Sequence, residues 1–131
     1  MAKFDLIGLG NALVDSEFHV TDSFLKKKGF EKGTMHLVDS DEQTNLLNSL
    51  EKEYGKPSLA CGGSATNTIF AASILGSSCS YICKVGNDKN GNFYLDDLSD
   101  AGVNIDHSVM LDSNINSGTC TVMVSPDAER T

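Results

Sequence analysis

The sequence predicts an α/β fold, and the order of its apolar segments leads to that conclusion. From residue 58 onward, short strand-like runs alternate with helical runs and glycine turns, as in layered α/β proteins. Near residues 13–20 and 34–38, by contrast, apolar and polar residues alternate, which is typical of strands with one face in solvent. Those two stretches do not fit a buried parallel sheet, and we expect them to form a separate, more exposed sheet.

Composition and charge indicate an ordinary globular chain with an acidic surface. The 131 residues are 40% hydrophobic and 21% charged, and the formal net charge is -8. An acidic chain repels phosphate backbones and anionic membranes, so neither nucleic acid nor a membrane is an expected partner. No apolar run reaches the ~18 residues of a membrane span, and the start of the chain lacks a signal-peptide pattern. A cytoplasmic location is therefore expected.

Strand-like segments occur throughout the first part of the chain. The apolar run at residues 4–9 predicts a buried strand that ends in a glycine turn. In residues 14–20, Asp15 and Glu17 share a polar face while the alternate residues are mostly apolar, so a half-exposed strand is expected. Residues 58–61 form a further short extended stretch that stops at paired glycines.

Two helices are predicted between these strands. Asp22 or Ser23 is expected to cap a short helix that runs through residue 28 and stops at Gly29. A longer helix is predicted over residues 39–54, because its leucines recur at helical spacing and a glycine and a proline follow it.

The second half of the chain predicts repeated strand–helix units. Ser64 is a suitable N-cap for a helix over residues 65–75, whose small residues suit close packing on a sheet. A buried strand is predicted at residues 80–85 and a helix at residues 91–100. Two more strands are predicted, at residues 109–111 and 119–124.

A glycine turn after the first strand is the first candidate for chemistry. The run Gly8-Leu9-Gly10 lacks the third glycine and the following helix of a dinucleotide fingerprint, and no P-loop pattern occurs. The turn is either a plain strand end or a means of exposing Asn11 and Asp15 where α/β sheets bind ligands. An aspartate and an amide together suit a vicinal diol, although Asp15 taken alone is more simply a solvated carboxylate.

Paired glycines before a predicted helix form the second candidate. Gly62 and Gly63 let a ligand approach the backbone, and the free amides of the following helix favour oxygen-rich ligands. Ser64 lies at the start of that helix, and Asn67 lies one turn further with both a donor and an acceptor. The local pattern alone fits a plain loop and helix cap better than a binding site.

The four cysteines predict neither a metal centre nor a covalent mechanism. No pair has the C-x-x-C spacing of a zinc site, and the histidines are scattered. Cys120 lies in a predicted strand and has no adjacent histidine to act as a base. We therefore predict no metal ligand among these residues and no covalent catalysis by Cys120.

Together, these segments resemble the PfkB family of carbohydrate kinases. The glycine-rich element of the family corresponds to Gly62-Gly63-Ser64-Ala65-Thr66-Asn67, and its G-x-D-x-x-G turn corresponds to Gly86-Asn87-Asp88-Lys89-Asn90-Gly91. The opening Gly10-Asn11-Ala12-Leu13-Val14-Asp15 and the later Gly118-Thr119-Cys120 are similar to the adenosine-kinase branch. The resemblance is collinear and covers essentially the whole chain.

The resemblance implies a ribokinase-like α/β sandwich with a small β-sheet lid, of which residues 1–131 would be the N-terminal, substrate-binding part. The lid strands would be those near residues 13–20 and 34–38. Asp15 and Asn11 would bind sugar hydroxyls, and Asn67 would bond a hydroxyl or a ring oxygen. The implied substrate-binding residues are Asn11, Asp15, Gly62, Gly63, Ser64 and Asn67, with Met35 and Cys120 as apolar contacts to a base or sugar.

The sequence lacks the second half of the family pattern. Family members are more than twice as long, and their later D-T-x-G-A-G-D signature supplies the catalytic base and an anion hole for the phosphates. That signature does not occur here, so the resemblance implies no catalytic residue in this chain. The resemblance therefore implies ATP and Mg2+ as cofactors of the full-length enzyme, with this chain inactive alone.

The resemblance leaves the substrate and the assembly open. It implies phosphate transfer from ATP to a primary hydroxyl of a nucleoside, adenosine-like first, with a simple sugar second. A kinase of phosphorylated sugars would need a basic cluster, for which Lys84 is the visible candidate. A non-catalytic ligand-binding or partner-binding module is the alternative from a different class. A homodimer formed through the lid strands is also compatible with the resemblance.

Overall fold

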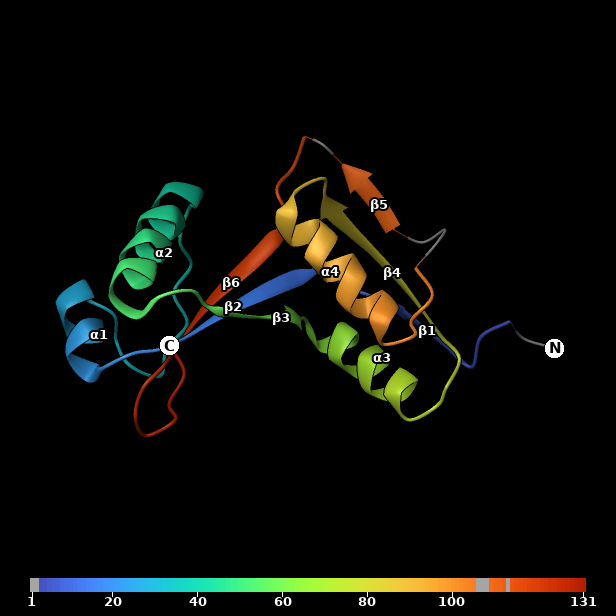
Figure 1. The fold of residues 1–131 in the computed structure, drawn as a ribbon, viewed down its shortest axis with the longest axis horizontal. Helices are drawn as coiled ribbons and strands as arrows, with labels where there is room; N and C mark the ends of the chain where they lie inside the picture. The colour runs from blue at the N-terminus through green and yellow to red at the C-terminus, as the bar shows by residue number, and fades with distance from the viewer. Residues whose placement is uncertain (1–2, 106–108, 113) are drawn as a thin grey trace. The chain divides into compact units, whose positions relative to one another are not determined.

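The computed structural model of the chain describes residues 3–105, 109–112 and 114–131 (Figure 1). The chain forms two compact units, each with its own apolar core. The first unit comprises Met1–Val14 and Ala60–Cys120, and the second comprises Asp15–Leu59 and Thr121–Thr131. Among the described helices, none has the length and apolar character needed to cross a membrane.

The first unit is built on a three-stranded parallel sheet with the order β1-β4-β5. Strand β1 spans Leu6–Leu9, β4 spans Cys79–Gly86 and β5 spans Val109–Asp112. Helices α3 (Ser64–Ile74) and α4 (Lys89–Asp100) precede and follow β4 in the chain and lie on one side of the sheet in Figure 1. The strand–helix–strand layering predicted for the second half of the chain is confirmed.

Strand β4 is the centre of this unit, and its alternate residues face opposite sides of the sheet. Tyr81, Cys83 and Val85 are buried in the core that α3 and α4 complete, whereas Ile82 and Lys84 are exposed. Burying each of the large side chains stabilises the fold by roughly 1.5–3 kcal/mol. The sheet is therefore anchored to its helices through one face of its middle strand.

Strand β1 is exposed, which corrects the expectation of a buried strand at residues 4–9. Ile7 and Leu9 are 63% and 75% exposed. In the parallel register Leu9 lies beside Ile82, so these exposed side chains share the sheet face opposite the helices. An apolar run predicts a strand, but it does not determine whether a second layer covers that strand.

The second unit packs two helices against strand residues. Helix α1 spans Asp22–Lys28 and α2 spans Ser40–Tyr54. The chain also contains a second sheet, with the strand order β3-β2-β6. Its strands are β2 (Leu13–His19), β3 (Ser58–Gly62) and β6 (Gly118–Val124), and each of them has residues in both units. The buried core of the second unit consists of Phe18, Val20, Phe24, Leu25, Leu50 and Met123.

The N-cap of helix α1 lies one residue before the first of its two predicted caps. Thr21, in extended conformation, is the N-cap, and its hydroxyl accepts a hydrogen bond from the amide of Phe24 at 3.3 Å. This corrects the choice of Asp22 or Ser23 as the cap, because the hydroxyl that reaches the third helical amide belongs to the residue before them. Gly29 ends the helix in the left-handed conformation, at φ 78°, as expected.

Residues 34–38 are irregular, which corrects the second lid strand expected from their alternation. The hydroxyl of Thr34 donates to the carbonyl of Glu31 at 2.7 Å and lies 2.8 Å from Nε2 of His36. The ring of His36 also packs edge-on against Phe30, with 5.1 Å between ring centroids. Such local contacts compete with strand pairing. The partners of β2 in its sheet are β3 and β6 instead, and the role of that sheet as a lid stays a prediction.

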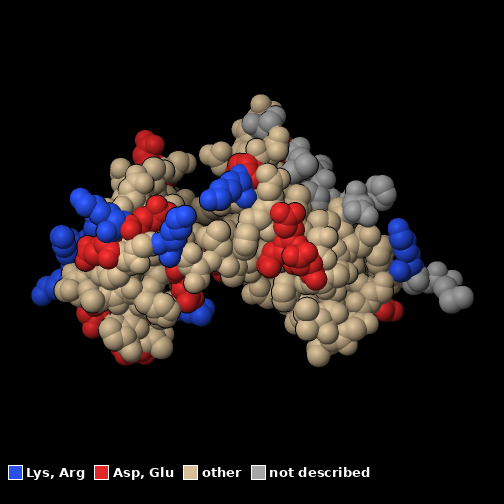
Figure 2. All heavy atoms as spheres, viewed as in Figure 1, with Lys and Arg blue, Asp and Glu red and all other residues tan. Residues whose placement is uncertain are grey.

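Charged side chains are unevenly distributed on the face shown in Figure 2. Basic and acidic side chains intermix over α1 and α2, whereas acidic side chains gather over α4. The sequence of α4 explains this gathering, because it contains Asp96, Asp97 and Asp100 while Tyr94 and Leu98 are buried. Helix α4 is therefore amphipathic, with its acidic side in solvent.

Candidate functional site

Three glycine-containing turns of the first unit lie in close contact. An ideal Cβ atom on Gly63 would lie 2.8 Å from the backbone oxygen of Asn11, and one on Gly118 would lie 2.8 Å from the backbone oxygen of Ala12. A Cβ atom does not approach a backbone atom so closely, so only glycine fits at both positions. The turn after β1 therefore touches both the turn after β3 and the start of β6.

Helix α3 begins at this contact without a side-chain cap. Gly63, at φ 105°, is the N-cap and Ser64 is the first helical residue, which corrects the expectation that Ser64 caps the helix. The amide of Asn67 donates to the carbonyl of Gly63 at 2.9 Å. The amides before Asn67 have no acceptor within the helix, and this positive end of the helix attracts ligand oxygens. The side chains of Ser64 and Asn67 are both exposed beside these amides.

Most of the predicted substrate-binding residues belong to this unit. Asn11 is exposed, and the contact of its backbone with Gly63 brings the first and second candidate motifs together. Gly62 is buried at the end of β3, directly before that contact. Cys120 carries an exposed thiol on β6, two residues after Gly118.

Asp15 lies on β2 in the second unit, and its side chain is half-buried. Burial raises the pKa of its carboxyl above the ordinary value of 3.8, Arg130 lowers it, and Glu17 raises it further. Arg130 itself lies closer to Glu17, with 3.8 Å between the guanidinium and the carboxylate. No hydrogen bond from a described residue contributes to the shift of Asp15. The carboxylate of Asp15 is therefore partly shielded from water, and its oxygens can accept hydrogen bonds.

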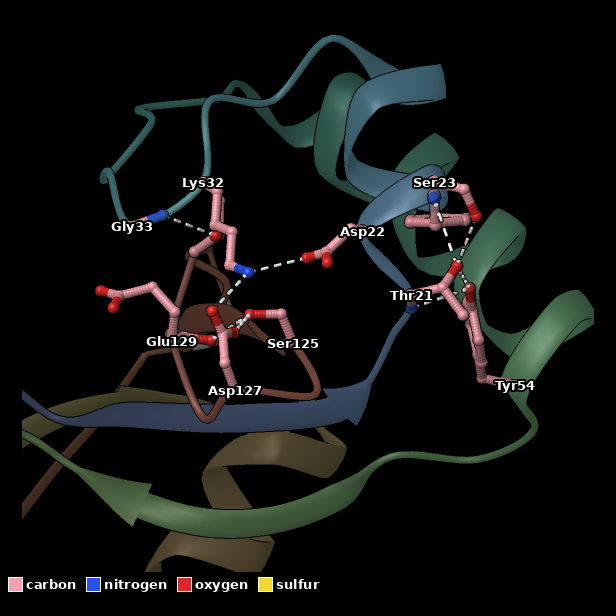
Figure 3. Close-up of polar contacts among 11 residues, drawn as sticks. Thr21, Asp22, Ser23, Lys32, Gly33, Tyr54, Ser125, Asp127 and Glu129 are labelled. Carbon is pink, nitrogen blue, oxygen red and sulfur yellow. Dashed lines mark hydrogen bonds and ion pairs between the residues drawn. The ribbon is translucent and has the colours of Figure 1, made fainter.

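Met35 also lies in the second unit and is 86% exposed in the irregular segment between α1 and α2. The start of that segment is held by an ion-pair cluster (Figure 3). The ammonium of Lys32 lies 2.8 Å from a carboxylate oxygen of Asp22 and 2.7 Å from one of Asp127. The segment is therefore fastened to α1 and to the turn after β6, while Met35 faces solvent.

Asp88 has a structural role in this geometry. Its carboxylate accepts hydrogen bonds from the amides of Gly91 and Ser117, both at 2.7 Å, and from the hydroxyl of Ser117 at 2.8 Å. Burial alone would raise the pKa of Asp88, but these hydrogen bonds outweigh it and hold the pKa below 3.8. The amide of Gly86 donates to the same Ser117 hydroxyl at 3.0 Å. The G-x-D-x-x-G turn thus caps α4 and fastens the loop before β6.

Lys84 is engaged by an acidic neighbour. Its ammonium lies 2.8 Å from the carboxylate of Asp112, and their hydrogen bond lowers the pKa of Asp112. The basic side chain considered for a phosphorylated sugar therefore already has a counter-ion within its own sheet.

Sequence reasoning missed a chain of three buried hydroxyl groups in the first unit. Thr66 in α3, Tyr81 in β4 and Tyr94 in α4 are each 0% exposed. The hydroxyl of Thr66 donates to that of Tyr81 at 2.9 Å and lies 2.6 Å from that of Tyr94. Two signals pointed to this chain, namely a threonine inside the glycine-rich motif and a tyrosine inside a strand expected to be buried.

Comparison with known proteins finds relatives over nearly all of this chain. The family model described as pfkB family carbohydrate kinase matches residues 34–131. Adenosine kinase 2 of Arabidopsis thaliana is 30% identical over 122 residues, which cover 91% of this chain and 34% of that protein. The ribokinase of Dictyostelium discoideum is 37% identical over 68 residues, which cover 52% of this chain and 21% of that protein.

A solved structure shows the same fold. The crystal structure of adenosine kinase from Sinorhizobium meliloti matches with a TM-score of 0.79 and 33% identity, over 98% of this chain and 38% of that one. The chain thus spans little more than a third of the length of these two adenosine kinases. The ribokinase-like α/β fold implied by the sequence resemblance is confirmed. Because the family match covers more than half of the chain and the fold agrees with it, the chain belongs to the pfkB family of carbohydrate kinases.

Proposed function

We propose that this chain forms the substrate site of a kinase that transfers phosphate from ATP to a primary hydroxyl of a nucleoside, with an adenosine-like molecule as the first candidate. The contact between the Asn11 turn and the uncapped Gly63 turn carries the proposal. That contact brings two exposed amide side chains, Asn11 and Asn67, into the region of backbone amides that favour oxygen ligands. A ribose offers such a region several hydroxyl groups at once.

The predicted residues take complementary roles in this proposal. Asp15 supplies the charged acceptor, and Asn11 helps it to hold the sugar hydroxyls. The paired-glycine turn approaches the sugar through its backbone, while Asn67 bonds a hydroxyl or the ring oxygen. Met35 and Cys120, both exposed, make apolar contacts to the base or the sugar. Similarity to adenosine kinases over most of the chain supports a nucleoside as the ligand.

The proposal places no site for ATP and Mg2+ among the described residues. Within the described part, no group of three or more His, Cys, Asp or Glu side chains is close enough to hold a metal ion. The sequence also lacks D-T-x-G-A-G-D, and its N-x-x-E match, Asn48 to Glu51, lies within helix α2. The proposal therefore gives this chain the binding and orientation of the substrate, and it assigns no step of phosphate transfer to its residues.

A simple sugar is the second candidate substrate. The ribokinase relative is 37% identical, against 30% for the adenosine kinase, but over a shorter part of this chain. A site that recognises only the ribose would bind adenosine and ribose alike, whereas a site that also contacts the base would prefer adenosine. The comparison of these two ligands therefore separates the candidates.

Isothermal titration calorimetry of the 131-residue chain with adenosine, ribose and fructose tests the proposal. We expect adenosine to bind most tightly, and we expect no transfer of phosphate from ATP when release of ADP is followed. Failure to bind any nucleoside or sugar would contradict the substrate site. Phosphate transfer by the pure chain would contradict the proposal that its residues carry out no step of the transfer.

A further inference from the structure

We propose that Thr66, Tyr81 and Tyr94 are positioning residues of the substrate site, which hold the Gly10 turn and the Gly63 turn in the geometry that binds a hydroxyl-bearing ligand. The inference rests on the proposed function, because it concerns the same site. All three side chains are fully buried, so they act through the backbone that they contact and do not touch the substrate.

The three hydroxyl groups form an ordered chain. Thr66 has one hydroxyl proton and donates it to Tyr81. The 2.6 Å contact between Thr66 and Tyr94 must then use the proton of Tyr94, so the donors run from Tyr94 through Thr66 to Tyr81. Burial raises the pKa of the Tyr94 phenol, which keeps it protonated and a donor at neutral pH. A buried hydrogen-bond network of this kind fixes the relative positions of α4, α3 and β4.

This chain of hydroxyls touches both turns of the candidate site. An ideal Cβ atom on Gly10 would lie 2.5 Å from the Tyr81 hydroxyl, and one on Gly63 would lie 3.1 Å from Oγ1 of Thr66. The hydroxyl oxygens thus occupy the space in which side chains at these glycines would lie. Asn11 directly follows Gly10 in the chain, and the uncapped amides of α3 directly follow Gly63. Removal of a hydroxyl would free the backbone on which these ligand-binding groups depend.

Substitutions at Thr66 separate the hydroxyl from the volume of the side chain. Thr66→Val keeps the shape but removes the hydroxyl, and we expect it to weaken adenosine binding about tenfold. Thr66→Ser keeps the hydroxyl and should bind within about twofold of the unsubstituted chain. Thr121→Val is the matched control, because Oγ1 of Thr121 is buried with no hydrogen-bond partner among the described residues. Its adenosine affinity should be unchanged.

Hydrogen–deuterium exchange at the amide of Asn67 supplies a readout that needs no ligand. This amide donates to the carbonyl of Gly63, so its exchange reports whether the turn is fixed. We expect Thr66→Val and Tyr81→Phe to speed this exchange about tenfold while amides in the middle of β4 stay protected. Tyr81→Phe keeps the aromatic ring and tests the same point if Thr66→Val does not fold.

Two outcomes would overturn the inference. The first is unchanged protection of Asn67 in both hydroxyl-removing variants, and the second is an equal loss of affinity in Thr66→Ser and Thr66→Val. If the unsubstituted chain binds neither nucleoside nor sugar, the proposed function fails, and the exchange measurement still decides whether the hydroxyl chain fixes the turn.

Discussion

Asp15 carries a carboxylate whose ionised form is disfavoured in the folded chain, since burial raises its pKa above 3.8. An acid of this kind binds its proton more tightly in the folded than in the unfolded state. Its contribution to the free energy of unfolding is therefore largest at low pH and falls as the pH rises from the unfolded pKa to the higher folded pKa. At neutral pH, the ionised carboxylate lowers the free energy of unfolding. Groups with a pKa perturbed in this way cluster at functional sites.

Substitution of Asp15 should separate stability from binding. Asp15→Ala should weaken adenosine binding about tenfold to hundredfold, because charge-assisted hydrogen bonds worth roughly 1.5–3 kcal/mol are lost. Asp15→Asn should raise the melting temperature at neutral pH but not at a pH below the unfolded pKa. Calorimetric titration and thermal unfolding measure the two effects.

Glu17→Gln is the matched control, because Glu17 lies two residues further along β2 on the same polar face. Its affinity for adenosine should stay within about twofold of that of the unsubstituted chain. An unchanged affinity in Asp15→Ala would remove Asp15 from the substrate site.

The start of α2 was predicted from the sequence because capping is a local interaction, whereas the caps of α1 and α3 were placed too late in the chain. Asp39 accepts a hydrogen bond from the amide of Glu42, whose carboxylate accepts one from the amide of Asp39, so α2 begins where the sequence indicates. The strand expected at residues 34–38 rested on alternation alone. A strand also needs a neighbouring strand with which to pair. Thr34 instead forms hydrogen bonds with Glu31 and His36, which are close to it in the chain.

The turn after β6 is tied to α1 by Lys32 (Figure 3). The hydrogen bond from Lys32 is the main reason that the pKa of Asp127 falls to about 2, and the hydrogen bonds to Asp127 and Asp22 raise the pKa of Lys32. The stabilisation linked to Asp127 is therefore present above its unfolded pKa, near 3.8, and is lost as the pH falls through about 2. The part linked to Lys32 is present below 10.5 and is lost as the pH rises through the higher folded value.

Replacement of Lys32 by methionine should expose this ion-pair cluster in unfolding experiments. Lys32→Met should lower the urea midpoint slightly at neutral pH and low salt, because both carboxylates are exposed and such pairs are weak. Its difference from the unsubstituted chain should shrink as the pH approaches about 2, and also in about 1 M salt, where exposed charges are screened.

Lys28→Met makes the same chemical change at an ammonium that donates to the hydroxyl of Ser49. Its difference from the unsubstituted chain should not depend on pH over the acidic range. If the effect of Lys32→Met also stayed constant there, the ion pair with Asp127 would not contribute to stability in solution.

At the scale of the whole molecule, the sequence predicts which strands and helices form the layers, but it does not predict which residues of distant segments come into contact. Asn11 and Gly63 are far apart in the chain, and the glycine motifs predicted a ligand without predicting that their backbones touch. The Thr66–Tyr81–Tyr94 chain was missed because one hydroxyl in a helix and another in a strand form no periodic pattern. Burial of β1 was wrongly expected for a related reason, since burial depends on which layers cover a strand.

The parallel sheet of the first unit leaves one apolar face open among the described residues. Ile7, Leu9 and Ile82 are all exposed on the face opposite α3 and α4. Parallel sheets are normally covered on both faces, and contiguous exposed apolar side chains promote association. We therefore expect the 131-residue chain to self-associate as its concentration rises.

The double variant Ile7→Thr/Leu9→Thr should reduce this association in sedimentation-velocity measurements. Threonine suits a strand, and the replaced side chains are exposed, so the free energy of unfolding should change by no more than about 0.5 kcal/mol per site. Ile74→Thr/Leu75→Thr is the matched control, because these side chains are 63% and 86% exposed at the end of α3, on the opposite face of the sheet. If the control reduced association as strongly, general surface hydrophobicity would explain it; if the unsubstituted chain stayed monomeric at every concentration, the open sheet face would not drive association.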